Sequence, residues 1–528
     1  MKKTIYCIIL FTVIAKVSIG QAAFLPYDYD LNTQMGKQLY SVGQRNHTSI
    51  KPYLLQDSSI STAFDSITSL TYKPYRKNLL VRKLFNEHLV QVSKKDYQLY
   101  LDFLPDFQIG RDISNHQTTW LNTRGIQFGG RIGKMVSFHT NYYEVQGKFP
   151  NYLTNYINTN RIVPGQGYIK PFKTNAFDYP NADGYISFTP DKHFTFQLGH
   201  GKTFIGDGYR SLLLSDNAFN YPFFKFVTTF GNIRLTNMWA QFSDFHNSPF
   251  TDTSAFPKKN GVFQYLDWSV SKRFTIGLFE NIMWQPRGFD LNYLNPIIFL
   301  RPIEFSEGSP DKVLIGINTS YKLAKSYLLY GQLAVNEFHV KELFKNNGYW
   351  ANKYGIQLGI RAFDLFKING LNTLIEYNSA RPFMYSANQP IKNYAHYNQS
   401  LAHPLGSNFR ELLTISNYNF KRFALRVQFN YALYGLDDPT NPNGNVGKDL
   451  YKPYTSRNGD YGYSIGNGIK TNLYYSDVKI SYLLNPKINL RFELGLVNRV
   501  EKNSLTNNKT NYITFGLRSS FRNFYYDF

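Results

Sequence analysis

Strict alternation between apolar and polar residues recurs along most of the chain. In KINLRFELGL, which begins at Lys487, every second residue is apolar: Ile488, Leu490, Phe492, Leu494 and Leu496. FALRVQFNYALY from Phe423 and YQLYLDFLPDF from Tyr97 repeat the pattern. A period of two places alternate residues on opposite faces of a β-strand. A strand with one apolar and one polar face suits a membrane barrel, with the apolar face toward lipid and the polar face toward the lumen.

Eighteen segments show this alternation, each close to the roughly 9–11 residues that a tilted membrane strand needs. They are centred on residues 97–109, 125–133, 135–145, 183–189, 193–200, 223–230, 232–243, 261–270, 273–283, 312–321, 325–336, 354–363, 368–379, 409–418, 421–433, 472–484, 487–499 and 510–521. The sequence therefore predicts an all-β fold: a transmembrane antiparallel outer-membrane β-barrel of about eighteen strands over residues 96–528.

The connections between these segments alternate in length. Tight turns follow the even-numbered strands, as at Gly133-Lys134, Pro190-Asp191, Gly231-Asn232, Ser271-Lys272 and Asn485-Pro486. Long connections follow the odd-numbered strands, at 146–182, 201–222, 284–311, 380–408 and 435–471. In outer-membrane barrels the short turns face the periplasm and the long loops face outside. We therefore expect an outer-membrane location, extracellular long loops and periplasmic N- and C-termini.

The two ends of the chain differ from the strands between them. The final predicted strand closes on Phe528 and resembles the signal that the barrel assembly machinery reads in bacterial outer-membrane proteins. Residues 21–95 lack the alternation, and Asn78–Val90 has helix-like spacing of its apolar residues. We expect residues 21–95 to form a small, partly helical periplasmic module before the barrel.

Residues 1–20 are predicted to be a secretory signal peptide. Lys2 and Lys3 precede a short apolar core, and Ser18 and Gly20 allow cleavage before Gln21. The apolar run is too short for a transmembrane helix. The only cysteine of the chain, Cys7, lies within this segment. The mature chain would therefore hold no disulfide, thiolate metal site or cysteine nucleophile.

The amino-acid composition agrees with an exported barrel, and its net charge indicates which classes of partner are favoured. Tyr, Phe and Trp make up 17% of the chain, and no apolar run reaches 18 residues. The formal net charge is +22, and it falls to +19 without Lys2, Lys3 and Lys16. For an exported protein this charge favours acidic glycans and lipid phosphates such as those of lipopolysaccharide, and disfavours nucleic acid. A lysine-rich proteome explains the charge equally well.

The densest signal is LGHGKTFIGDGYRSLLLSDNAFNYPF, from Leu198 to Phe223, which joins the fifth and sixth predicted strands. Its GHGKT ends like a phosphate-binding loop, but that motif needs a glycine where the chain has Phe196. No helix is predicted to follow, and nucleotides are absent outside the cell. The glycines are better explained by a tightly folded loop that needs positive φ angles.

This stretch resembles the Wzi-like capsule assembly family. The resemblance is carried by Gly206-Asp207-Gly208, Ser211-Leu212, Ser215-Asp216-Asn217-Ala218 and Pro222. LNPIIFLRPIEF (294–305) and HPLGSNFRELL (403–413) are similar to segments of its gliding-motility-associated, RemB-like relatives. The resemblance implies a barrel whose lumen is occluded by loops and which binds or organises surface (capsular or exo-) polysaccharide. It also implies a link to gliding motility or surface adhesion, in a possible secretion or motility complex. The chain departs from the family at Lys202–Ile205, where Arg and Trp are common, which leaves the glycan open.

Two groups of side chains are candidates for function. Polysaccharide contact is predicted for Lys202, Asp207, Tyr209, Arg210, Ser215 and Asn217, with support from loop residues Tyr152, Tyr156, Tyr451, Tyr454, Lys448 and Lys452. Charges inside the lumen are predicted for Arg301, Glu304, Arg410 and Glu411. Each set also has a structural interpretation: Asp207 and Arg210 would pair within a plug, and Ser215 and Asn217 would cap a turn.

The sequence contains no residue pattern that favours catalysis or the binding of a metal or cofactor. The ten histidines are scattered, no paired histidines suggest zinc, and we expect neither catalytic residues nor a metal or other cofactor. The loop at 436–449 is rich in oxygen ligands but lacks the spacing of an EF-hand. Two functions therefore remain: a non-enzymatic polysaccharide-binding barrel with a lumen blocked by the loops 201–222 and 284–311, or a diffusion porin lined by charges such as Arg426 and Arg491. A barrel enzyme is a distant third.

Overall fold

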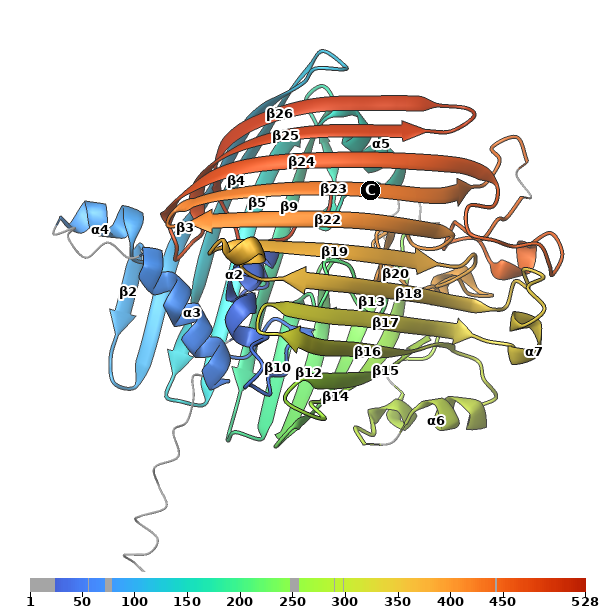
Figure 1. Cartoon of the computed structure of the whole chain (residues 1–528), viewed down its shortest axis with the longest axis horizontal. Helices are drawn as coiled ribbons and strands as arrows, with labels where there is room; N and C mark the ends of the chain where they lie inside the picture. Colours follow the sequence, from blue (N-terminus) through green and yellow to red (C-terminus); the bar gives the residue numbers. More distant parts are fainter. Residues whose placement is uncertain are drawn as a thin grey trace, which may run out of the picture.

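A computed structural model of the chain describes residues 24–55, 57–71, 78–246, 256–288, 290–297, 299–441 and 444–528. The predicted signal peptide and its cleavage site lie outside these residues. Figure 1 shows one large barrel, with helices at both of its ends.

Eighteen strands form the barrel wall. They are β3 (Tyr97–Asp112), β4 (Gln117–Ile132), β5 (Val136–Lys148), β9 (Ala176–Phe188), β10 (Phe194–Gly201), β12 (Tyr221–Phe230), β13 (Ile233–Ser243), β14 (Lys258–Trp268), β15 (Phe274–Trp284), β16 (Lys312–Ala324), β17 (Tyr327–Glu337), β18 (Lys353–Ala362), β19 (Leu371–Ala380), β22 (Phe409–Phe420), β23 (Phe423–Leu436), β24 (Ile469–Asn485), β25 (Leu490–Lys502) and β26 (Asn507–Ser519). Each pairs antiparallel with the next, and β26 pairs with β3 to close the barrel. Each of the eighteen predicted segments overlaps one of these strands, so the predicted fold class is confirmed.

The side chains alternate across the wall as predicted. On β25, Phe492 and Leu494 are 44% and 38% exposed on the outer face, whereas Glu493 between them is 5% exposed and faces inward. On β23, Val427 and Phe429 are exposed, whereas Gln428 and Asn430 are buried. The outer face is therefore apolar and the lumen is polar, as a barrel in lipid requires.

The two ends of the barrel differ in the length of their connections. Short turns join β4 to β5, β9 to β10, β12 to β13, β14 to β15 and β24 to β25, as predicted. The long connections that follow β5, β10, β15, β19 and β23 gather at the opposite end (Figure 1). We call these the short-turn end and the long-loop end. Which end faces the periplasm stays a prediction.

The remaining elements are short. The helices are α2 (Tyr29–Leu39), α3 (Ser58–Thr71), α4 (Leu79–Phe85), α5 (Asn151–Asn160), α6 (Arg301–Ser306) and α7 (Val340–Leu343). The short strands are β1 (Ile50–Lys51), β2 (Val90–Ser93), β6 (Ile162–Val163), β7 (Gly167–Tyr168), β8 (Lys170–Phe172), β11 (Phe204–Ile205), β20 (Ala395–His396) and β21 (Gln399–Ser400). Single 3₁₀ turns lie at Leu291–Leu294, Leu365–Lys367, Pro390–Lys392 and Tyr454–Ser456. The helix α4 lies where helical spacing predicted one. Among the described helices, none has the length and apolar character to cross a membrane.

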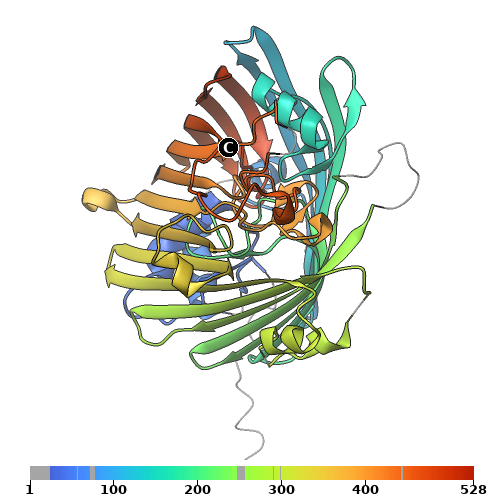
Figure 2. The same cartoon turned by 90° about the vertical axis from the view of Figure 1, so that its right-hand side faces the viewer.

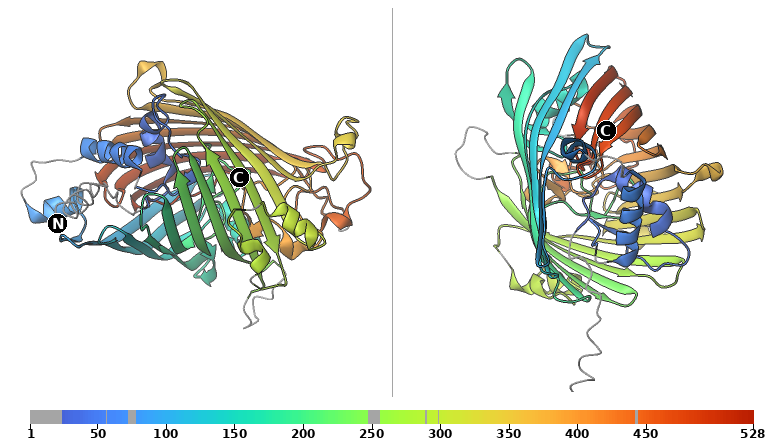
Figure 3. Two further views of the ribbon diagram at one scale, coloured as in Figure 1. Left: turned by 90° about the horizontal axis from the view of Figure 1, so that it is seen from below. Right: turned by 90° about the vertical axis from the view of Figure 1, so that its left-hand side faces the viewer.

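The N-terminal segment packs into the barrel at its short-turn end, where α2 and α3 are seen in the mouth of the barrel (Figure 3, right). Leu25, Met35 and Leu39 share one apolar cluster with the wall residues Leu328 and Leu413. Lumen-facing cations of the wall also hold this segment, since Arg426 lies 2.9 Å from Asp30 and Arg234 lies 2.9 Å from Asp57. Residues 24–57 therefore share their core with the barrel. The periplasmic position predicted for residues 21–95 stays a prediction.

The C-terminal end of the chain differs from the expected strand. The strand β26 ends at Ser519, and residues 520–528 turn into the lumen rather than running on to Phe528 in the wall. This tail passes Asn523, which accepts a hydrogen bond from the backbone of Tyr29, and ends with Phe528 against Tyr156 of α5 at the long-loop end. The tail is polar and aromatic, so it finds hydrogen-bond partners inside that a lipid-facing strand end would lack.

Candidate functional site

Four segments fill the lumen, as the view from the long-loop end shows (Figure 2). They are the N-terminal segment 24–57, the loop 202–220 between β10 and β12, the loop 381–408 between β19 and β22, and the tail 520–528. The strand β11 of the loop 202–220 pairs with β1 of the N-terminal segment inside the lumen. Tyr385 and Tyr394 donate hydrogen bonds to the carbonyls of Leu212 and Leu213. We call these four segments together the plug. The structure places the loop 201–222 in the lumen, where a blocking role was predicted for it; the other three segments were not predicted to lie there.

Arg210 is the central ionic link of the plug. Its guanidinium lies 2.9 Å from Glu411 on the wall and 3.0 Å from Asp527 of the tail, and its side chain is 1% exposed. His403 of the loop 381–408 lies 2.8 Å from the same Glu411. The two carboxylates hold the pKa of Arg210 well above its usual range despite burial, so it stays charged. Breaking such a buried set by removing one partner leaves an uncompensated charge.

The residues beside Arg210 are bound in the same way. Asp207 accepts hydrogen bonds from the Tyr40 hydroxyl at 2.8 Å and the Thr48 hydroxyl at 3.2 Å, both in the N-terminal segment. The backbone N–H groups of Tyr209 and Arg210 donate to Glu376 on the wall, at 2.9 and 3.1 Å. Asp207 and Arg210 thus both serve the plug, but each pairs with other segments and not with the other.

Lys202, at the start of the same loop, and Ser215 and Asn217, near its end, are bound to protein as well. The Lys202 ammonium donates to the carbonyls of Gly165 at 2.8 Å and Asp216 at 3.0 Å, and burial lowers its pKa to about 8. The Ser215 hydroxyl accepts a hydrogen bond from the backbone N–H of Asn217, as the predicted turn cap requires. The Asn217 amide donates to the Ser400 carbonyl. All six predicted glycan-contact residues thus lie in the plug, where their polar groups bind protein.

Only one of the four predicted lumen charges lies in the lumen. Glu411 faces the lumen as predicted, but Arg410, one residue before it on β22, is exposed on the outer face because successive strand residues point to opposite sides. Arg301 and Glu304 lie on α6, outside the barrel (Figures 2 and 3). Glu280, on the outer face of β15, accepts hydrogen bonds from the backbone N–H groups of Leu300 and Arg301. The loop 284–311 therefore covers the outer wall and does not block the lumen, which corrects the prediction for Arg301, Glu304 and Arg410.

A wide cleft of about 960 Å³ lies at the long-loop end, above the plug. The helix α5, the tops of β25 and β26, and the loops 381–408 and 437–468 form its walls. It brings together four loop residues of the sequence prediction, Tyr152, Tyr156, Lys448 and Tyr451, with Asn217 of the plug. Tyr454 and Lys452 lie elsewhere, since Tyr454 packs against Trp350 and Lys452 binds Asp437.

Amide and aromatic side chains dominate this cleft. Asparagines line it from α5, the β3–β4 turn and the start of β26: Asn115, Asn151, Asn155, Asn160, Asn507, Asn508 and Asn511. The Arg499 guanidinium lies over the Tyr152 ring at 4.7 Å and donates to the Phe528 carbonyl at 2.9 Å. Burial lowers the pKa of Lys448 to about 7, and its ammonium donates to the Leu405 carbonyl. The α5 asparagines were not singled out from the sequence, although the run NYLTNYINTN in a predicted long loop was a usable signal.

Metal sites find no support among the described residues, where no three His, Cys, Asp or Glu side chains are grouped to hold an ion. In the loop 436–449, Asp437 binds Lys452 at 2.6 Å and Asp438 accepts from Thr440. The described part of that loop therefore uses these carboxylates in contacts of its own.

Comparisons with known proteins show the fold. No protein-family model matches the sequence, and no curated protein matches it. The chain is similar to the solved structure of Wzi, an outer-membrane protein involved in group 1 capsule assembly in Escherichia coli and described as a carbohydrate-binding β-barrel. The TM-score is 0.56 and the identity 13%, over 94% of this chain and 100% of Wzi. The outer-membrane protein OprD of Pseudomonas aeruginosa matches with a TM-score of 0.43 and 12% identity, over 83% of this chain and 97% of OprD.

At these identities the likeness concerns the fold alone. The chain thus has a Wzi-like barrel fold. None of the comparisons supports the resemblance to RemB-like proteins, which stays a prediction.

Proposed function

We propose that this protein is a non-enzymatic outer-membrane β-barrel that binds surface polysaccharide in the cleft at its long-loop end. One observation carries the proposal: a plug fills the lumen, and an open cleft lined by amides and aromatic rings lies on top of it. The sequence-predicted sugar contacts Tyr152, Tyr156 and Tyr451 meet in this cleft, although they come from α5 and from the loop 437–468.

The chemistry of the cleft suits a polyhydroxylated chain. Asparagine amides both donate and accept hydrogen bonds, as sugar hydroxyls do. Tyrosine rings offer flat apolar surfaces to the faces of sugar rings, and their hydroxyls offer further hydrogen bonds. The exposed Lys509 supplies a cation for an acidic glycan. The cleft volume of about 960 Å³ lies at the upper end of the usual range for ligand sites, so several sugar units fit.

The plug argues against a diffusion porin. A porin needs a continuous aqueous path, whereas buried side chains of the plug bridge the wall to the tail at Arg210 and the wall to the N-terminal segment at Asp207. The charges named for a channel are also engaged, since Arg426 binds Asp30 and Arg491 binds Glu493.

The Wzi-like fold supports an outer-membrane location and a role beside surface glycan, because Wzi itself is described as carbohydrate-binding. Lipopolysaccharide, the barrel assembly machinery and a secretion or motility complex are further proposed partners. A contribution to gliding motility or surface adhesion would follow from holding polysaccharide at the cell surface.

The test is the binding of the purified barrel to the surface polysaccharide of its own host, at low and high salt, beside single-channel recording in planar bilayers. We expect saturable binding and no steady conductance. Binding that weakens with salt would identify an acidic glycan. Steady ohmic conductance without polysaccharide binding would reject the proposal in favour of a porin.

A further inference from the structure

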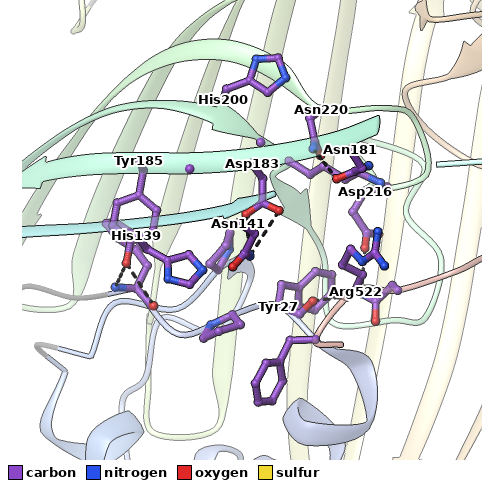
Figure 4. A pocket seen from close by; sticks show the side chains of 18 of the residues that line it. Tyr27, His139, Asn141, Asn181, Asp183, Tyr185, His200, Asp216, Asn220 and Arg522 are labelled. Carbon is purple, nitrogen blue, oxygen red and sulfur yellow. Dashed lines mark hydrogen bonds between the residues drawn. The ribbon is translucent and has the colours of Figure 1, made fainter. Parts of the chain in front are cut away.

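A second, smaller cavity lies inside the lumen, below the cleft. Its volume is about 150 Å³. The strands β5, β9, β10 and β12 form one wall, and the N-terminal residues Phe24–Tyr27 and the tail residues Ser520–Phe524 form the other (Figure 4). Lys202, Gly165 and Asp216 line it where the plug separates it from the cleft, which begins at Asn217. The candidate glycan residues of the cleft itself do not line this cavity.

Three polar groups around this cavity have atoms that lack a hydrogen-bond partner among the described residues. They are the Gln197 Oε1 on β10, the Asn141 Oδ1 on β5 and one terminal nitrogen of Arg522 in the tail. Gln197 is only 3% exposed. A buried polar atom left without a partner loses the hydrogen bond that water would give it. Three of them around one cavity indicate that a polar ligand completes the site.

The carboxylates of the cavity already have hydrogen-bond donors, and its cations make contacts of their own. Asp216 accepts from the Asn523 amide at 2.8 Å and the Tyr525 hydroxyl at 2.7 Å. Asp183 accepts from the Asn141 amide at 3.1 Å, and Lys225 donates to the Thr203 hydroxyl at 2.9 Å. Arg522 stacks on the Tyr143 ring at 3.7 Å and donates through its Nε to Ser520. The two carboxylates therefore have donors, whereas the Arg522 guanidinium keeps one open N–H donor.

The unpartnered atoms select the chemistry of the ligand. Two of them are carbonyl oxygens, which need a hydrogen to accept, and the third is an N–H donor. A carboxylate or phosphate has no hydrogen for Gln197 or Asn141. A hydroxyl group can donate to these oxygens, and a second hydroxyl can accept from Arg522. Tyr27, Tyr185 and Phe223 add aromatic surface to the cavity.

We propose that this lumen cavity binds one neutral sugar unit, with hydroxyls donating to Gln197 and Asn141 and accepting from Arg522. The site is separate from the cleft, so the inference does not rest on the function proposed above. A barrel with both sites would hold a long glycan in the cleft and a free monosaccharide or chain end inside the plug.

The test is saturation-transfer NMR of the purified barrel with D-glucose, D-galactose and N-acetyl-D-glucosamine. The detergent is dodecyldimethylamine oxide, because a maltoside detergent would itself supply sugar. Wild type is compared with Gln197→Met, which keeps the side-chain length and removes the amide. The matched control is Gln241→Met, because Gln241 lies on the outer face of β13. Tyr156→Ala is measured in parallel to remove a wall of the cleft.

We expect saturable binding of at least one monosaccharide, weakened about tenfold or more in Gln197→Met and unchanged in Gln241→Met and Tyr156→Ala. Asn141→Leu and Arg522→Met should weaken it as well, so that one poorly folding variant does not decide the outcome. Binding lost in Tyr156→Ala but kept in Gln197→Met would place the sugar in the cleft and overturn the inference. Absence of binding, or binding only of acetate or glycine used as charged probes, would overturn it too.

Discussion

The guanidinium of Arg210 and the carboxylate of Asp527, 317 residues apart in the chain, lie 3.0 Å from each other inside the barrel. Arg210 belongs to the loop between β10 and β12, and Asp527 belongs to the tail that follows the last strand. Glu411 on the wall binds the same guanidinium at 2.9 Å. Loop, tail and wall are thus joined at one buried charge, which makes the plug a part of the barrel rather than a loose insert.

Replacing Arg210 should destabilise this joint. In Arg210→Met, Glu411 and Asp527 lose their buried cation, at an expected cost of about 3–5 kcal/mol. We expect a lower unfolding temperature and ion leakage through the loosened lumen. The matched control is Arg410→Met on the outer face of β22, where a change within about 0.5 kcal/mol is expected. Equal stability of the two variants would show that the Arg210 contacts do not contribute to the stability of the folded barrel.

Removal of the tail should open the lumen without removing a strand. Because β26 ends at Ser519, deletion of residues 522–528 leaves all eighteen wall strands. It removes the contacts of Tyr525 with Asp216 and of Asp527 with Arg210. We expect a folded barrel, seen as a heat-dependent mobility shift on gels, that conducts ions in planar bilayers. A folded truncated barrel that stays closed would show that the other three plug segments suffice.

Lys202 should give the plug a pH-dependent stability. Burial lowers its folded-state pKa to about 8, below the ordinary value of 10.5. Between these two values the unfolded chain holds a proton that the folded chain has released, so the free energy of unfolding rises with pH through this window. The contribution is at most about 3 kcal/mol. Urea unfolding at pH 7.5 and 10.5 should show a larger rise for wild type than for Lys202→Met. Equal rises would contradict the buried position of this ammonium.

The loop 284–311 should depend on a carboxylate of the outer wall. Glu280 accepts the backbone N–H groups of Leu300 at 2.8 Å and Arg301 at 2.6 Å, at the start of α6. In Glu280→Ala the loop loses both acceptors, and we expect cleavage by chymotrypsin after the exposed Phe305 of α6 to accelerate about tenfold or more. Glu342→Ala in the exposed helix α7 serves as the control. An unchanged cleavage rate would mean that apolar packing by Leu300 on Ile282 and Trp284 holds the loop alone.

The wall was predictable from the sequence because its period of two is a direct consequence of strand geometry. In Lys487–Leu496 and Phe423–Tyr434, apolar and polar residues alternate along the sequence, so the two faces of each strand can be assigned directly. The folding of the loops was not predictable in the same way. Arg301 and Glu304 lie in a long connection, and no local pattern says on which side of a wall such a loop packs. Arg410 and Glu411 are neighbours in a predicted strand, so the alternation itself required one of them to face away from the lumen.

One signal for the outer position of the loop 284–311 was present and unused. Glu280 occupies a position of β15 where the alternation calls for an apolar, lipid-facing residue. Gln264 breaks the alternation on β14 in the same way and donates to the Asn295 carbonyl of that loop. Polar residues on a lipid-facing surface need covering partners, so such breaks predict a segment folded against the outside. The cleft, by contrast, depends on packing between α5, the tail and the distant loop 437–468, which spacing within the sequence does not encode.

The central claim is that the long-loop cleft holds surface polysaccharide, and one measurement addresses it directly. Binding of the host's purified polysaccharide is compared between wild type, Tyr156→Ala and Tyr461→Ala. Tyr156 lies in the wall of the cleft, whereas Tyr461 is an exposed tyrosine of the loop 437–468 outside it. We expect about tenfold weaker binding for Tyr156→Ala and unchanged binding for Tyr461→Ala. Equal binding by all three proteins, or none by wild type, would contradict it.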